Sequence, residues 1–257
     1  MDANFKLKVE QFVASRITDF HNRRLAGVES LTLLNLLDGK NPYLFRAKNL
    51  ESAADLIGAL LDARLSSAEE GLFGKFLEAL ARFVSEEKCA GRKSSTTGID
   101  IELERGGIRY LIAVKSGKSW SNSSSMKKQR ENFITALKVL KQDAGIGPLQ
   151  PTIGICYGRS AKSDNGAFLR IYGKDFWELI SGEPELYKEI IEPIGHRAKE
   201  FNEEFDLKKA HAINRLVREF TERFCRTDGQ IDWQSVVTLV SENRPSRSPR
   251  SSSRDTP

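Results

Sequence analysis

The chain contains 257 residues, of which 39% are hydrophobic and 29% charged, and both signs of charge are mixed along it. This composition can bury the core of one large domain or two small ones, and no apolar run approaches the roughly 20 residues that cross a bilayer. The start, MDANFKLKVEQF, has acids and no apolar stretch before a small-residue cleavage site. We therefore expect no secretory signal, a cytoplasmic location and no membrane partner. The three cysteines and three histidines are scattered, which argues against a disulfide framework or a zinc cluster.

The net charge of +5 depends largely on the end of the chain, NRPSRSPRSSSRDTP, which has four arginines and one aspartate. Its Ser, Arg and Pro content predicts a disordered basic tail over residues 243–257. A second basic run, KSGKSWSNSSSMKKQR at residues 115–130, has five basic residues and no acid. Such a run is typical of a phosphate-contacting surface, but also of a solvated loop and helix start.

Residues 1–65 show apolar side chains at helical spacing and predict a helical N-terminal region. A further helix is expected to begin at LSSAEE, where Ser66 with Glu69, or Ser67 with Glu70, matches the capping box. Asn49 is a candidate N-terminal cap for the helix that follows it in the sequence.

After residue 98 the pattern alternates, as in strands, and Gly106-Gly107 predicts the turn of a β-hairpin. A helix over about 123–141 and strands over 151–158 and 167–173 follow, and residues from about 175 return to helix. This order predicts a mixed α/β sheet flanked by helices, with additional helical regions at both ends.

The turn sets the hairpin register, which pairs Arg105 with Ile108, Ile101 with Ile112 and Asp100 with Ala113. One face is then predicted to be apolar, with Ile99, Ile101, Leu103, Tyr110, Ile112 and Val114, and the other polar, with Asp100, Glu102, Glu104, Arg109 and Lys115 around Leu111 and Ala113. Glu104 and Arg109 are expected to form a rim pair. Asp100 and Lys115 are expected to converge, because an unpaired buried ammonium is costly and needs an acid or an anion.

Gly98-Ile99-Asp100 and Ala113-Val114-Lys115 resemble the two halves of the PD-(D/E)XK nuclease motif. Over residues 40 to 160 the chain also resembles the type II restriction endonucleases whose type member cuts the interrupted site RGGNCCY, through five segments in order: NPYLFRAKN, LSSAEEGLFGKFLEALA, GIDIE, VKSGKSWSNSS and CYG. The resemblance implies an Mg²⁺-dependent endonuclease that cuts double-stranded DNA at a specific site. It also implies a homodimer and a cognate DNA methyltransferase in the same restriction-modification system.

The residue patterns and the resemblance together predict four segments: a helical N-terminal region (1–65), a PD-(D/E)XK nuclease core (66–175), a C-terminal helical region (176–242) and the basic tail (243–257). Asp100 and Lys115 are the expected catalytic residues, and Asp100 is also a metal ligand. Within the basic run, DNA contacts are expected from Lys118, Trp120, Asn122, Lys127, Lys128 and Arg130.

Ala113 departs from the motif, because it stands where an acid is expected and its side chain cannot bind a metal. The backbone carbonyl of Val114 remains a candidate ligand. Glu78 is the first candidate for the missing acid, since Gly71, Gly74 and Ala81 share its side of the helix and would let that helix approach the sheet; its alternative is a surface pair with Arg82. Glu102 is the second candidate, and a glutamate restored at Ala113 is expected to be tolerated.

Two other functions compete with a restriction enzyme. One is a repair or junction-resolving nuclease of the same fold. The other is a DNA-binding protein that has lost catalysis, for which Ala113 is the reason. Cys156 is expected to be a core residue, because no histidine lies near it in the sequence to activate it as a nucleophile.

Overall fold

A computed structural model describes residues 2–120, 122–142 and 147–242. The chain divides into two compact units, residues 1–27 with 67–206, and residues 28–66 with 207–257. Three long helices each contribute residues to both units: α1 (Ala3–Glu29), α4 (Ala53–Cys89) and α9 (Ala198–Phe224). The predicted tail at 243–257 lies outside the described residues.

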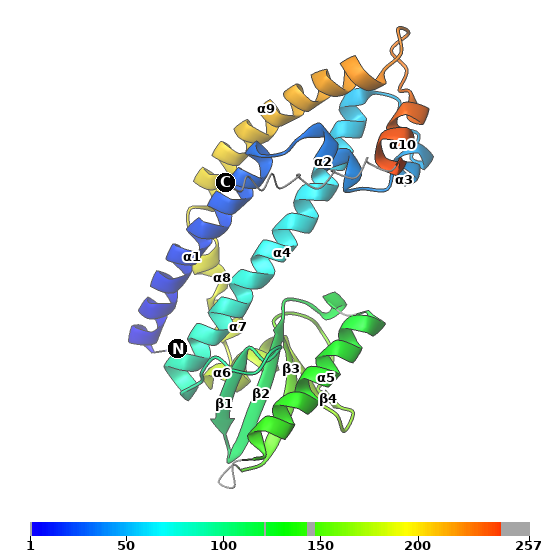
Figure 1. Cartoon of the computed structure of the whole chain (residues 1–257). Helices are drawn as coiled ribbons and strands as arrows, with labels where there is room; N and C mark the ends of the chain where they lie inside the picture. Colours follow the sequence, from blue (N-terminus) through cyan, green and yellow to red (C-terminus); the bar gives the residue numbers. More distant parts are fainter. Residues whose placement is uncertain (1, 121, 143–146, 243–257) are drawn as a thin grey trace, which may run out of the picture. The chain divides into compact units, whose positions relative to one another are not determined.

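The first unit contains the sheet (Figure 1). Its strands are β1 (Ile101–Arg105), β2 (Ile108–Lys115), β3 (Leu149–Ile155), β4 (Ser163–Asp164) and β5 (Leu169–Tyr172). Its other helices are η1 (Lys118–Trp120), α5 (Ser123–Leu140), α6 (Gly173–Ser181), α7 (Leu186–Glu189) and α8 (Ile191–Ile194).

The sheet is mixed, as predicted, with the strand order β1-β2-β3-β5-β4. β1 and β2 are antiparallel in the predicted register from Ile101 to Arg105, with Arg105 opposite Ile108 and Ile101 opposite Ile112. The predicted pairing of Asp100 with Ala113 is wrong, because Asp100 donates its backbone N–H to the carbonyl of Ile112. β2, β3 and β5 are parallel to one another. Because β2 and β3 run in parallel, α5 serves as the crossover between them.

Each face of the sheet carries an apolar cluster. Ile101, Leu103, Ile112 and Val114 pack with side chains from α1, α4 and α6. On the other face Leu111, Ala113 and Ile153 pack against Phe133 and Ala136 of α5, which lies along that side in Figure 1. The sheet is therefore the middle of three layers.

The expected polar face of the hairpin is not solvent-exposed, because α5 covers it. Leu111 and Ala113 are fully buried under α5, and Ile99 packs with them instead of with Ile101. Arg109 lies 3.8 Å from Glu102, so the predicted rim pair with Glu104 is replaced by a more buried one.

The prediction that a helix begins at LSSAEE is wrong. α4 begins at Ala53 and passes through Ser66 and Ser67 without a break. Its cap is Ser52, whose Oγ accepts a hydrogen bond from the backbone N–H of Asp55 and donates one to the Asp55 carboxylate. Asn49 instead binds Glu51 through its side chain. Leu61 and Leu65 before Ser66, and Phe76 and Leu77 further along the same helix, are buried. Their packing outweighs the weak preference of serine for helix ends.

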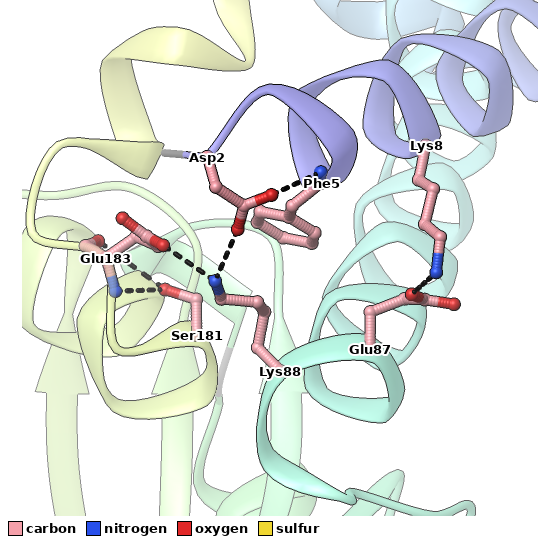
Figure 2. A network of polar contacts seen from close by, with 7 residues as sticks. All are labelled: Asp2, Phe5, Lys8, Glu87, Lys88, Ser181 and Glu183. Atoms are coloured by element: carbon pink, nitrogen blue, oxygen red, sulfur yellow. Dashed lines mark hydrogen bonds and ion pairs between the residues drawn. The ribbon is translucent and has the colours of Figure 1, made fainter.

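Polar contacts tie the ends of α1, α4 and α6 together (Figure 2). Nζ of Lys88 lies 2.8 Å from Oε1 of Glu183 and 3.2 Å from Oδ2 of Asp2. Asp2 also accepts the backbone N–H of Phe5 at 2.8 Å, which caps α1, and Lys8 pairs with Glu87 at 2.6 Å. These contacts hold the α1 and α4 layer in place on the sheet.

The second unit is helical in its described residues. It contains α2 (Leu33–Asp38), α3 (Pro42–Ala47), α10 (Trp233–Ser241) and parts of the three long helices. Its buried side chains include Leu36, Phe45, Leu60, Leu216 and Phe220. None of the helices in the described part of the chain is long and apolar enough to cross a membrane.

Candidate active site

Asp100 lies just before β1 and is fixed to β2 by two hydrogen bonds. Its backbone N–H donates to the carbonyl of Ile112 at 2.8 Å, and its Oδ2 accepts the backbone N–H of Val114 at 2.7 Å. The other oxygen, Oδ1, has no hydrogen-bond partner among the described residues. The strand pairing thus positions the carboxylate and leaves one oxygen for a ligand.

Lys115 ends β2, and its side chain is partly exposed. Its Nζ lies 5.2 Å from the centroid of the Trp120 ring, in a cation–π contact. Within the described residues no acid lies within 4.0 Å of this ammonium. Lys115 is therefore oriented by an aromatic ring rather than by an acidic partner.

Glu78 reaches the same site from α4. Gly74 lies one turn earlier on the same side of the helix, and a Cβ built there would be 3.7 Å from Cβ of Ser116, the residue after Lys115. α4 therefore approaches the end of β2 at Gly74, as the small-residue spacing predicted, whereas a Cβ on Gly71 would meet nothing within 4 Å.

Burial raises the pKa of Glu78, and the nearby Asp100 carboxylate raises it further. Lys115, Arg82 and Lys93 act in the opposite direction on this pKa. The predicted surface pair with Arg82 is replaced, since Arg82 lies 3.8 Å from Glu86. α4 thus brings Glu78 toward the end of the sheet that holds Asp100 and Lys115, and neither carboxylate has a cation within 4.0 Å among the described residues.

Glu102 lies on the α5 side of β1 and is 3% exposed. Its carboxylate accepts hydrogen bonds from Ser94 at 2.6 Å and from Arg92 at 2.9 Å. Both oxygens are therefore occupied by protein donors, which makes Glu102 a poorer metal ligand than Glu78.

Ala113 is fully buried in the apolar cluster under α5. A glutamate there would place a third carboxylate among Ile99, Leu111 and Phe133, which costs several kcal/mol unless it is paired. The burial of Ala113 therefore favours the opposite prediction, that a glutamate at this position destabilises the protein.

The predicted DNA contacts lie beyond the end of β2. Lys118, Lys127, Lys128 and Arg130 are exposed. Asn122 caps α5, where its side chain accepts the backbone N–H of Ser125 at 2.9 Å, and Trp120 packs on the cluster under α5. The four cations are thus accessible, while Asn122 and Trp120 also have structural contacts.

Lys93 was not predicted from the sequence, although its charge reaches Glu78. The only sequence signal was the pair Arg92-Lys93 just before the hairpin. Cys156, by contrast, is buried as predicted, and burial raises the pKa of its thiol to about 12, far from a reactive thiolate.

A family model described as Type II restriction endonuclease EcoO109I matches residues 7–202, about three quarters of the chain. The chain belongs to this family. It is accordingly a type II restriction endonuclease, a site-specific deoxyribonuclease that hydrolyses phosphodiester bonds, and its substrate is DNA. A search of curated proteins found no match. The EcoO109I family match includes all residues of the site described above, from Glu78 to Arg130.

Proposed function

We propose that residues 66–175 form a PD-(D/E)XK nuclease core that cuts both strands of a specific duplex site with Mg²⁺. One arrangement carries this proposal: Asp100 is hydrogen-bonded to Val114, the neighbour of Lys115, and α4 approaches Ser116 at Gly74, one turn before Glu78. Neither carboxylate has a cation within 4.0 Å among the described residues. Even partial burial of two neighbouring carboxylates is unfavourable unless a cation compensates their charge.

The donor set fits Mg²⁺, which takes oxygen ligands, retains several waters and is held by one or two carboxylates plus substrate phosphate. The described residues hold no group of three or more His, Cys, Asp and Glu side chains suited to a metal. Oδ1 of Asp100, the Glu78 carboxylate and the backbone carbonyl of Val114 would supply the protein ligands, with Glu102 as the weaker alternative. Bound Mg²⁺ polarises the phosphate and lowers the pKa of a coordinated water.

Lys115 would orient the attacking water or stabilise the charge that develops on the phosphate in the transition state. Its contact with Trp120 supports this role, because a preoriented ammonium loses little entropy on binding an anion. Because Ala113 has no carboxylate, we propose that Glu78 of α4 is the second acid.

Lys118, Lys127, Lys128 and Arg130 would bind phosphates along the duplex, and Trp120 and Asn122 would line the same path. Such contacts position the protein more than they read the sequence. Their number also makes binding depend strongly on salt.

A near-palindromic site requires two copies of the cutting residues, so we propose a homodimer. A cognate methyltransferase in the same cytoplasm would protect the host DNA. The helical regions 1–65 and 176–242 would then serve dimer formation or DNA binding outside the core.

The test is one digest of a sequenced plasmid by the purified protein, with and without Mg²⁺, followed by sequencing of the fragment ends. Discrete ends at one recurring sequence, formed only with Mg²⁺, support the proposal. Ends without a common sequence favour a repair or junction-resolving nuclease, and binding without cutting favours a protein inactivated by the loss of the acid at Ala113.

A further inference from the structure

The residues just before the hairpin are fixed against the outer edge of β1. The backbone N–H of Arg92 donates to the carbonyl of Glu102, and the N–H of Glu102 donates to the carbonyl of Arg92, each at 2.8 Å. This reciprocal pair is that of two antiparallel residues directly opposite each other. The segment from Arg92 to Ser94 is therefore anchored on the outer edge of β1, near Asp100.

The side chains show which way this segment faces. Arg92 and Ser94 both bind the buried carboxylate of Glu102, on the α5 side of the sheet. Side chains alternate along an extended chain, so Lys93, between them, projects to the opposite side. That side is the one on which Ile101 and Leu103 pack against α4, the helix that carries Glu78.

Lys93 is exposed, and no acid lies within 4.0 Å of it among the described residues. The antiparallel bridge between Arg92 and Glu102 sets Lys93 across from Ile101, the residue that follows Asp100. Lys93 thus lies beside the start of β1, whereas Lys115 lies at the end of β2.

We propose that Lys93 is a second phosphate-binding residue of the active site, which holds a non-bridging oxygen of a DNA phosphate beside the carboxylate pair. The inference rests on the proposed roles of Asp100, Glu78 and Lys115. Glu102 acts as a positioning residue, because it holds Arg92 and Ser94 and thereby directs Lys93. Two carboxylates repel a DNA backbone, and a cation on each side offsets that repulsion where the phosphate must enter.

The test compares Lys93→Gln and Lys93→Arg with Lys188→Gln. Lys188 is exposed and pairs with Glu185 at 2.6 Å, so it is a control for losing one surface charge. Binding to a short duplex that carries the mapped cut site is measured at several salt concentrations without divalent cations. Single-turnover cutting with Mg²⁺ and thermal unfolding are measured on the same proteins.

For Lys93→Gln we expect the slope of log K against log salt to become shallower by about 0.9, the loss of one phosphate contact. Cutting should slow by roughly tenfold or more. Lys93→Arg should retain the slope, and unfolding should be unchanged in all three variants.

An unchanged slope in Lys93→Gln, or an equal change in Lys188→Gln, would overturn the inference. The slope is measured without chemistry, so this result is separate from the proposed function, which fails instead if a variant of Asp100 cuts normally.

Discussion

Val114 donates its backbone N–H to Oδ2 of Asp100 at 2.7 Å, so the aspartate that precedes one strand is held by the end of the next. The hydrogen bond occupies one carboxylate oxygen and orients the other. Asp100 therefore has two roles. It completes the pairing of the two strands, and it carries the negative charge that we propose binds the metal.

These tasks can be separated by substitution. An asparagine at position 100 can still accept the N–H of Val114 but has no charge, so Asp100→Asn should remain folded, bind DNA and lose cutting. Asp100→Ala should lose cutting and also about 1–3 kcal/mol of unfolding free energy, because the buried N–H of Val114 loses its acceptor. Cleavage assays measure the loss of cutting, and urea unfolding measures the loss of stability. Lys115→Ala should lose cutting to the same extent as Asp100→Asn. Wild-type cutting by Asp100→Asn or Lys115→Ala would remove these residues from the site.

Glu78→Gln should raise the Mg²⁺ concentration needed for half-maximal cutting by at least about tenfold, since it removes a proposed ligand. Glu102→Gln should change that concentration less but lower the melting temperature, because Arg92 and Ser94 lose a charged partner. Glu86→Gln, on the exposed side of the same helix, is the control. If Glu102→Gln is inactive while Glu78→Gln needs no additional Mg²⁺, the metal is held by the hairpin alone.

The raised pKa of Glu78 predicts a pH dependence of stability. Between its ordinary pKa of 4.5 and the raised value, the folded protein binds more protons than the unfolded chain, so stability falls as pH rises through this window. Glu78→Gln should reduce this fall, and Mg²⁺ should oppose it at the upper end. Melting temperatures across this range, with and without Mg²⁺, measure both effects. Curves of equal steepness for wild type and Glu78→Gln would show that this carboxyl does not carry the dependence.

Ala113→Glu should destabilise the protein by several kcal/mol, because position 113 is fully buried under α5. Ala113→Val adds volume without charge and separates packing from electrostatics. Denaturant unfolding measures the difference. A stable Ala113→Glu variant that cuts at lower Mg²⁺ would mean that the glutamate turns out of the cluster to the metal.

Replacing Lys127 and Lys128 by glutamine should make the salt dependence of DNA binding shallower by up to about 1.8, from two lost phosphate contacts. The matched control replaces Lys188 and Lys199, which pair with Glu185 and Glu203. Binding titrations at several salt concentrations give the slopes. Equal slopes for the double variant and wild type would show that this part of α5 is only a solvated face.

The sequence by itself determined the hairpin register, because the alternation of side chains and the Gly106-Gly107 turn are local properties. It also determined the mixed sheet and the helix between its parallel strands, because the order of strand and helix patterns is visible along the chain. The small residue at Gly74 correctly indicated that the helix approaches the sheet there.

Only the tertiary structure decided which sides of these elements are buried. The same alternation fits a solvated face and a face under a helix, and α5 buries Leu111 and Ala113 through contacts that no local pattern contains. Likewise, Arg92 and Ser94 bind the carboxylate of Glu102, and α4 approaches Ser116 at Gly74, because segments outside the hairpin pack against it. Side-chain spacing is set by the backbone, whereas desolvation and charge interactions depend on non-local packing.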